Sequence, residues 1–193
     1  GFGFGFGFGH RVEMPYTWNG TPHQDLQGRG DYNPTIAQPW QQRLVHTVNR
    51  SLIVPYSALE MYALVNDVDR YHEFLPWCNE SETLEQEDEV SVARISIAFK
   101  GLNTAFTTRN RLVPGRSIHM KLCEGPSFKT LLGDWQFVPL DDCACRIELS
   151  VRFILAGRIA EKALAPIFSR ICADLVNAFA GRAKELYGER AFA

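Results

Sequence analysis

The most regular feature of the chain is an alternation of apolar and polar side chains from Cys145 to Leu155. Apolar residues fill every second position there, and Arg146, Glu148 and Arg152 lie between them. Period two predicts a strand with one buried and one solvated face. Shorter alternating runs predict further strands at 48–54, 95–99, 106–112, 118–122 and 135–137.

Helical spacing replaces this alternation in two regions. Ser57 and Glu60 form a capping box that predicts a short helix ending near Asn66, and a second helical turn ends before Pro76. The C-terminal helix, kinked or started by Pro166, has an apolar stripe wider than a surface helix needs. The stripe comprises Ile167, Ile171, Leu175, Ala178, Arg182 and Leu186, flanked by Leu164, Phe168, Cys172, Phe179 and Ala183.

This order of elements predicts an α+β fold. A sheet with one apolar face has to bury that face, and the wide stripe of the last helix is the obvious partner. A sheet that curves around a single helix leaves an apolar cavity between the two. We therefore expect a hydrophobic cavity in this domain.

Residues 1–45 differ from the rest of the chain in composition. They hold 8 Gly and 4 Pro, open with a Gly-Phe alternation, and show no sustained period of two or 3.6 residues. Such a segment buries too little apolar surface to offset the entropy of ordering its backbone. We expect residues 1–45 to be a disordered or non-native tail and residues 46–190 to form one domain.

Overall composition narrows the class of protein. The formal net charge of −2 over 193 residues gives no whole-chain attraction for nucleic acid. No apolar run approaches the roughly 18 residues of a membrane-spanning helix, so we expect none. The five cysteines are scattered and odd in number, which favours a reducing compartment.

Several short motifs follow one another between residues 46 and 188 in a specific order. They are Val54-Pro55-Tyr56-Ser57, Phe74-Leu75-Pro76-Trp77-Cys78, Phe106-Thr107-Thr108-Arg109-Asn110, Gly125-Pro126 with Gly133 and Trp135, and Ala178-Phe179 with Arg182-Ala183. Together they resemble the START-like coenzyme Q-binding family of the polyketide cyclase/dehydrase superfamily, which includes bacterial ribosome-association toxins. Ser127 departs from the pattern, because the family runs Gly-Pro-Phe without a residue at that point.

The resemblance implies a helix-grip (START/Bet v 1-like) fold, in which a curved antiparallel sheet wraps around a long C-terminal helix. It also implies that the cavity binds a lipophilic molecule, with ubiquinone, a polyprenyl benzoquinone, as the leading ligand rather than a catalytic cofactor. The protein would then support respiratory electron transport or quinone delivery. It would work in the cytoplasm at the inner membrane, or on the matrix side in a mitochondrion, with transient membrane contact because a long quinone tail exceeds the cavity.

The resemblance implies an alternative function as well. Bacterial members are assigned binding to the large (50S) ribosomal subunit, which blocks subunit association. The basic residues available for such contact are Arg109, Arg111, Arg116, Lys121, Lys129, Arg158, Lys162, Arg170, Arg182 and Lys184. The acidic stretch from Glu80 to Glu89 reads as a solvated hairpin edge that would repel RNA. A polyketide-cyclase-like enzyme is a more distant third possibility.

The candidate ligand-binding residues are apolar or aromatic side chains expected to face the cavity. They are Phe74, Leu75, Trp77, Phe106, Met120, Trp135, Phe137, Leu149, Ile171, Leu175 and Phe179. Aromatic walls suit a flat quinone ring, although each residue also suits an ordinary core. No ionisable side chain falls on the apolar strand faces, so we expect no catalytic residue and no enzyme activity. Cys143 and Cys145 lack further ligands nearby, so we expect no metal site.

Deleting residues 1–45 tests the predicted division of the chain. Because this segment has no apolar periodicity and lies outside the family resemblance, we expect the free energy of unfolding in urea to stay within about 0.5 kcal/mol of the full chain. Strong amide protection across Gly20 to Pro39, or a large loss of cooperative unfolding after the deletion, would contradict this division.

Overall fold

A computed structural model of the protein describes residues 44–192. The tail predicted at residues 1–45 therefore lies almost wholly outside the described residues, and the predicted division stays a prediction. Within the described part, seven strands form one antiparallel sheet in the order β1-β7-β6-β5-β4-β3-β2. The strands are β1 (His46–Val54), β2 (Cys78–Gln86), β3 (Val90–Phe99), β4 (Leu102–Val113), β5 (Ser117–Glu124), β6 (Phe128–Pro139) and β7 (Cys145–Leu155).

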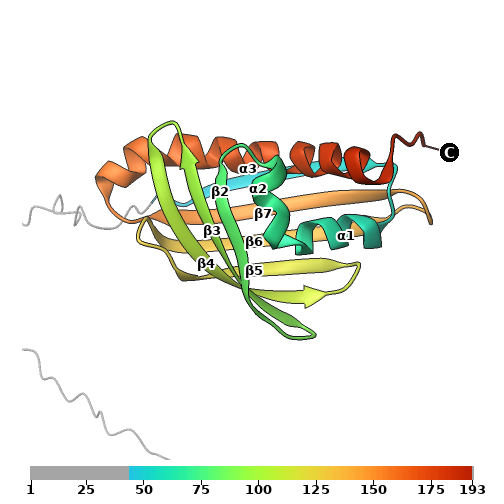
Figure 1. Cartoon of the computed structure of the whole chain (residues 1–193). Helices are drawn as coiled ribbons and strands as arrows, with labels where there is room; N and C mark the ends of the chain where they lie inside the picture. The colour runs from blue at the N-terminus through green and yellow to red at the C-terminus, as the bar shows by residue number, and fades with distance from the viewer. Residues whose placement is uncertain (1–43, 193) are drawn as a thin grey trace, which may run out of the picture. The chain divides into compact units, whose positions relative to one another are not determined.

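Along the chain, the helices lie before and after the run of strands from β2 to β7. After β1 come α1 (Ala58–Asn66), the 3-10 turn η1 (Val68–Arg70) and the single turn α2 (Tyr71–Phe74), and α3 (Arg158–Tyr187) follows β7. Figure 1 shows β2, β3 and β4 running across the direction of β6 and β7, so the sheet curls around α3. The predicted α+β helix-grip fold is confirmed.

The apolar face of α3 packs mainly against β1 and β7. Its buried residues are Ala165, Phe168, Ile171, Cys172, Val176, Phe179 and Ala183. The predicted stripe included Leu186, which is half-exposed, and omitted Val176, which is buried. The buried face of the helix therefore lies slightly to one side of the predicted stripe. The helix also begins at Arg158, so Pro166 lies inside it rather than at its start.

By length and composition alone, α3 is apolar enough to cross a membrane, which corrects the expectation that no such stretch exists. A third of the apolar window is buried inside the structure. Phe168, Cys172, Val176 and Phe179 belong to the hydrophobic core of the domain. The need to face this core accounts for much of the apolar character of the helix.

Strand β6 begins seven residues earlier than the alternation predicted, because it continues through Gly133. A Cβ at Gly133 would fall where the terminal methyl of Met120 lies, so the glycine leaves room for that methyl. Further back, β6 carries a bulge between Phe128 and Thr130. A bulge absorbs one extra residue in a strand, and this one lies directly after Ser127.

The acidic stretch from Glu80 to Glu89 lies at an edge of the sheet, as expected. Strand β2 is an edge strand, and Glu80, Glu82 and Glu85 on it are exposed. Charge on an exposed edge discourages pairing with another chain. The alternation missed β2 as a strand because its side chains are polar on both faces.

The predicted capping box is confirmed. The Glu60 backbone N–H donates to Ser57 Oγ at 3.2 Å, and the Ser57 backbone N–H donates to Glu60 Oε2 at 2.8 Å. Arg190 donates to both Glu60 oxygens at 2.9 and 3.0 Å. This guanidinium, together with Ser57, lowers the pKa of the Glu60 carboxyl.

Replacing Ser57 with Ala should lower the free energy of unfolding by about 1 kcal/mol, because an orphan helix N–H loses its acceptor. Since the pKa of Glu60 is lowered in the folded protein, the stability it contributes is present above its ordinary pKa and declines as the pH falls through the lowered value. Urea unfolding measures both effects. Ser51→Ala, an exposed position on β1, is the control; equal losses in the two variants would contradict a capping role.

Candidate functional site

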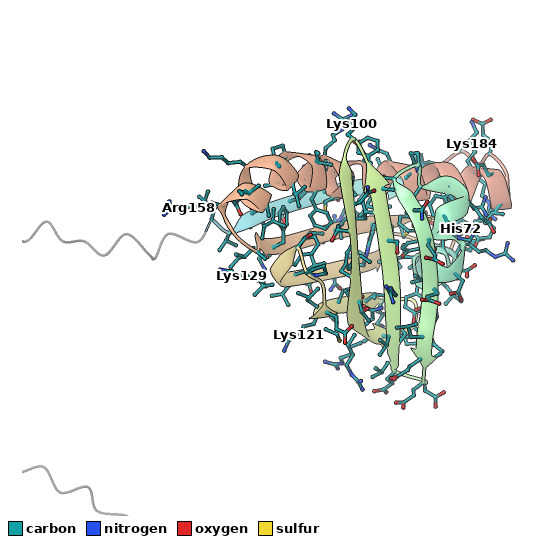
Figure 2. All side chains as sticks on the ribbon, turned by 60° about the vertical axis from the view of Figure 1, so that its left-hand side comes forward. His72, Lys100, Lys121, Lys129, Arg158 and Lys184 are labelled. Atoms are coloured by element: carbon teal, nitrogen blue, oxygen red, sulfur yellow. The ribbon has the colours of Figure 1, made fainter. Side chains whose placement is uncertain are left out.

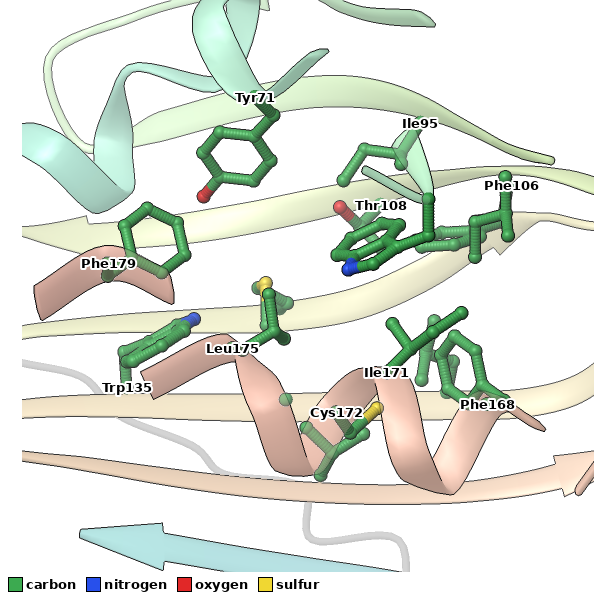
Figure 3. Close-up of a pocket in the computed structure, with 16 residues that line it drawn as sticks. Tyr71, Ile95, Phe106, Thr108, Trp135, Phe168, Ile171, Cys172, Leu175 and Phe179 are labelled. Carbon is green, nitrogen blue, oxygen red and sulfur yellow. The ribbon is translucent and has the colours of Figure 1, made fainter. Parts of the chain in front are cut away.

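An apolar cavity lies between the inner face of the sheet and α3 (Figure 3). Its free volume is about 70 Å³. All space between the atoms of the wall, including open solvent at the mouth, amounts to about 610 Å³. Ile95, Met120 and Leu175 are the partly exposed members of the wall. Solvent therefore reaches the cavity beside these three residues.

Most of the predicted ligand-binding residues lie in the cavity wall. These are Trp77, Phe106, Met120, Trp135, Ile171, Leu175 and Phe179. Phe74, Leu75, Phe137 and Leu149 do not line the cavity, and they pack in or against the core instead. Alternation identifies which face of a strand a residue occupies, but not how far along that face the cavity extends. Contact with a ligand remains a prediction for each residue.

The sequence prediction missed other residues of the wall. These are Tyr71, Ile95, Ile97, Thr108, Leu131, Gly133, Val151, Phe168 and Cys172. Some of them could have been found from the pattern itself. Thr108 is two residues from Phe106 on the same face of β4, and Val151 continues the alternation of β7. Gly133 could not be found in this way, because it has no side chain and interrupts the alternation before Trp135.

Two groups of aromatic rings close the ends of the cavity. At one end Phe168 packs against Phe106 and Phe128, with ring centroids 6.2 and 4.9 Å apart. At the other end Phe179 packs edge-on against Tyr71 and Trp135 at 5.2 and 5.4 Å. Figure 3 shows Phe106 and Phe168 of one group and Tyr71, Trp135 and Phe179 of the other, with Leu175 and Ile171 of α3 between them. This arrangement gives an apolar slot with an aromatic group at each end and with Trp77 as a further aromatic ring in the wall, which suits a flat apolar ring.

The ionisable groups in the wall are both held protonated by burial. Desolvation raises the pKa of Tyr71, and its hydroxyl donates to the Val65 carbonyl at 2.6 Å. Desolvation also raises the pKa of the Cys172 thiol to about 12. Neither group exchanges a proton readily near neutral pH. Across residues 44–192, no cluster of three or more His, Cys, Asp or Glu side chains has a geometry that could hold a metal ion.

Two sets of basic residues differ in whether they are paired with carboxylates. On α3, Arg170 pairs with Asp174, Lys184 with Glu189, and Arg182 with both Glu73 and Glu185. On the outer face of the sheet, Arg109 is in register with Lys121, and Arg111 lies in the neighbouring row. Arg109, Arg111, Lys121 and Arg152 are exposed and form no ion pair within the described residues. We call these four residues the outer basic face.

Comparison with known proteins places the chain in a family. Residues 54–180 match the family described as polyketide cyclase/dehydrase and lipid transport. The chain is 48% identical over 142 residues to the ribosome association toxin RatA of Vibrio cholerae, which covers 74% of this chain and 98% of that protein. It is 32% identical over 130 residues to the mitochondrial coenzyme Q-binding protein COQ10 of Drosophila melanogaster, which covers 66% of this chain and 54% of that protein.

The solved structures agree on the fold. The Zhui aromatase/cyclase from Streptomyces sp. R1128 superimposes with a TM-score of 0.68 at 22% identity, over 77% of this chain and 98% of that chain. At this identity the likeness shows the fold alone. The sequence matches span the strands and the helix that build the cavity, and they confirm the resemblance expected from the motifs. The chain belongs to the polyketide cyclase/dehydrase and lipid transport family.

Proposed function

We propose that the protein binds a lipophilic ring with an isoprenoid tail, a polyprenyl benzoquinone such as ubiquinone, and supports respiratory quinone delivery. The observation that carries this proposal is the apolar slot with aromatic ends between the sheet and α3. A relative named for coenzyme Q binding supports the choice of ligand. The protein then acts as a binding protein rather than an enzyme, because the ionisable groups of the wall keep their protons.

The size of the slot sets how the ligand enters. About 70 Å³ of free space exceeds the room that one buried water needs but is small for a substituted quinone ring. Side chains of the wall therefore have to move when a ring binds. Met120 and Leu175 are suited to this, because both are partly exposed and Met120 is unbranched and flexible.

A long isoprenoid tail has to leave the cavity, which requires a membrane or another apolar surface. The beginning of α3 offers one contact: Ile159 is 87% exposed and lies next to Arg158 in the chain and three residues before Lys162. Lys129 lies near these two cations, together with Glu161. Figure 2 shows Lys129 and Arg158 at the same end of the domain. An exposed apolar side chain close to cations suits transient contact with an anionic membrane surface.

Quinone content tests the main proposal. The protein purified from a quinone-producing host should carry solvent-extractable quinone at a substantial fraction of one per chain. Leu175→Trp fills the slot from α3, and we expect it to weaken quinone binding about tenfold, since overpacking costs about 1–3 kcal/mol. Extraction with chromatography and titration with a short-tailed ubiquinone measure the two effects.

Leu164→Trp is the matched control. It makes the same change on the same helix at a partly buried position outside the cavity wall, so we expect unchanged quinone binding. A wild-type protein that carries no quinone and takes none from vesicles would refute the proposal. Full quinone binding in a stably folded Leu175→Trp variant would refute the slot as its site.

A second function, association with the large ribosomal subunit, is favoured by a separate observation. The relatives named ribosome association toxin reach 48% identity and are covered almost completely by this chain. The outer basic face supplies cations that no acidic partner occupies within the described part of the chain. We propose that this face contacts ribosomal RNA in preference to Arg170, Arg182 and Lys184 of α3, because those three cations are paired with carboxylates.

Charge reversal tests this second function. Arg109→Glu combined with Lys121→Glu should abolish co-sedimentation with purified large subunits at moderate salt. In the milder Arg109→Gln and Lys121→Gln variants, the logarithm of affinity should fall less steeply with the logarithm of salt concentration. The slope should decrease by about 1 for each phosphate contact removed. Arg170→Glu with Lys184→Glu, which reverses two exposed and paired cations of α3, is the control. Equal losses from both pairs would contradict a specific outer face, and absence of wild-type binding would remove this function.

A further inference from the structure

The side chain of Asn110 on β4 has an unpaired polar atom in the interior. Asn110 is 4% exposed, and its Nδ2 donates to Ser91 Oγ at 3.2 Å. Its Oδ1 is the one buried side-chain nitrogen or oxygen within residues 44–192 that lacks a hydrogen-bond partner. Buried polar atoms are nearly always paired, because an unpaired one loses its water without compensation. The atom therefore needs an explanation beyond the fold.

The position of Asn110 relates this atom to the cavity. Thr108, two residues earlier on the same face of β4, lines the cavity. Asn110 is in register with Met120 on β5, and Met120 is in register with Gly133 on β6. Met120 and Gly133 both line the cavity. Asn110 thus lies directly beside the cavity wall, next to Met120, without lining the cavity in this structure.

The neighbouring methionine makes this amide reachable by a ligand. Met120 places its terminal methyl over Gly133, where any other residue would have its Cβ. The methyl itself lies over β6, two strands from β4. To reach the amide, a ring has to rest over the Met120 position on β5, about 5 Å from β4, the spacing of neighbouring strands. The side chain of Met120 has three rotatable bonds and adapts easily to such a displacement.

We propose that Asn110 hydrogen-bonds an oxygen substituent of the bound ring and so fixes the ring's orientation in the slot. This inference rests on the proposed quinone binding and adds the group that contacts the oxygen atoms of the ring. Oδ1 can accept from the hydroxyl of a quinol. If the amide turns over, Ser91 donates to Oδ1 and Nδ2 donates to a quinone carbonyl. The Asn110–Ser91 pair therefore serves either redox form without a proton transfer.

A pair of ligands that differ only in ring oxygens tests this role. The probes are a short-tailed ubiquinone and geranylbenzene, an isoprenoid-substituted ring without oxygens. Asn110→Leu keeps the approximate side-chain volume and removes the amide. We expect it to weaken ubiquinone binding about tenfold, because the ring loses one hydrogen bond and the orientation that this bond fixes. Geranylbenzene binding should be unchanged.

Asn103→Leu is the matched control, because Asn103 is exposed on the same strand. The carbonyl stretching band of bound, isotope-labelled quinone gives a second readout. In the wild type one carbonyl should shift to lower frequency, and Asn110→Leu should remove the shift. Thermal unfolding shows whether the variant is folded. We expect little change in the midpoint, because the unpaired Oδ1 is removed but the buried Ser91 hydroxyl loses its partner.

The outcomes separate this inference from the proposed function. Loss of affinity for both probes in Asn110→Leu, or for neither, overturns the role of Asn110 while quinone binding stands. If Asn110→Leu does not fold, an unshifted carbonyl band in the wild-type complex overturns it by itself. A wild-type protein that binds neither probe overturns both proposals.

Discussion

The packing of one helix against only part of a curved sheet is the constraint on which the cavity depends. Helix α3 covers β1 and β7, while β3, β4 and β5 curl around the remaining space. Their inner side chains, among them Ile95, Phe106 and Met120, therefore line a cavity instead of meeting a helix. Close packing would be the more stable arrangement, since atoms at a void lose dispersion contacts. The two aromatic groups stabilise the ends of the slot and leave its middle open.

The alternation of the strands keeps the two proposed functions apart. On β4, Phe106, Thr108 and Asn110 face inward, whereas Arg109 and Arg111 face solvent. Because neighbouring residues of a strand point to opposite faces, the same short segment contributes to the quinone slot and to the outer basic face. Substitutions on one face leave the other face in place. Quinone binding and ribosome association are therefore separable by mutation even though they share a sheet.

Local rules in the sequence predicted the elements better than the site. Strict alternation identified β7, and the Ser57–Glu60 spacing identified a capping box that the structure confirms. The predicted beginning of β6 was wrong because Gly133 interrupts the alternation before Trp135, although the strand continues through Gly133 and makes room there for Met120. That need arises from a neighbouring strand and is invisible in β6 alone. The cavity wall depends in the same way on where α3 crosses the sheet, so Phe137 and Leu149 were placed on the correct face but outside the slot.

The chemistry of the wall agrees with the proposed binding function. Acid–base catalysis near neutral pH needs groups whose pKa values lie close to that range. Here burial moves the pKa values of Tyr71 and Cys172 upward, and the Tyr71 hydroxyl is committed to a backbone carbonyl. A neutral amide such as that of Asn110 can orient a ring oxygen but cannot take its proton. Apolar walls, protonated thiol and phenol, and an unpaired amide together favour holding a quinone over transforming it.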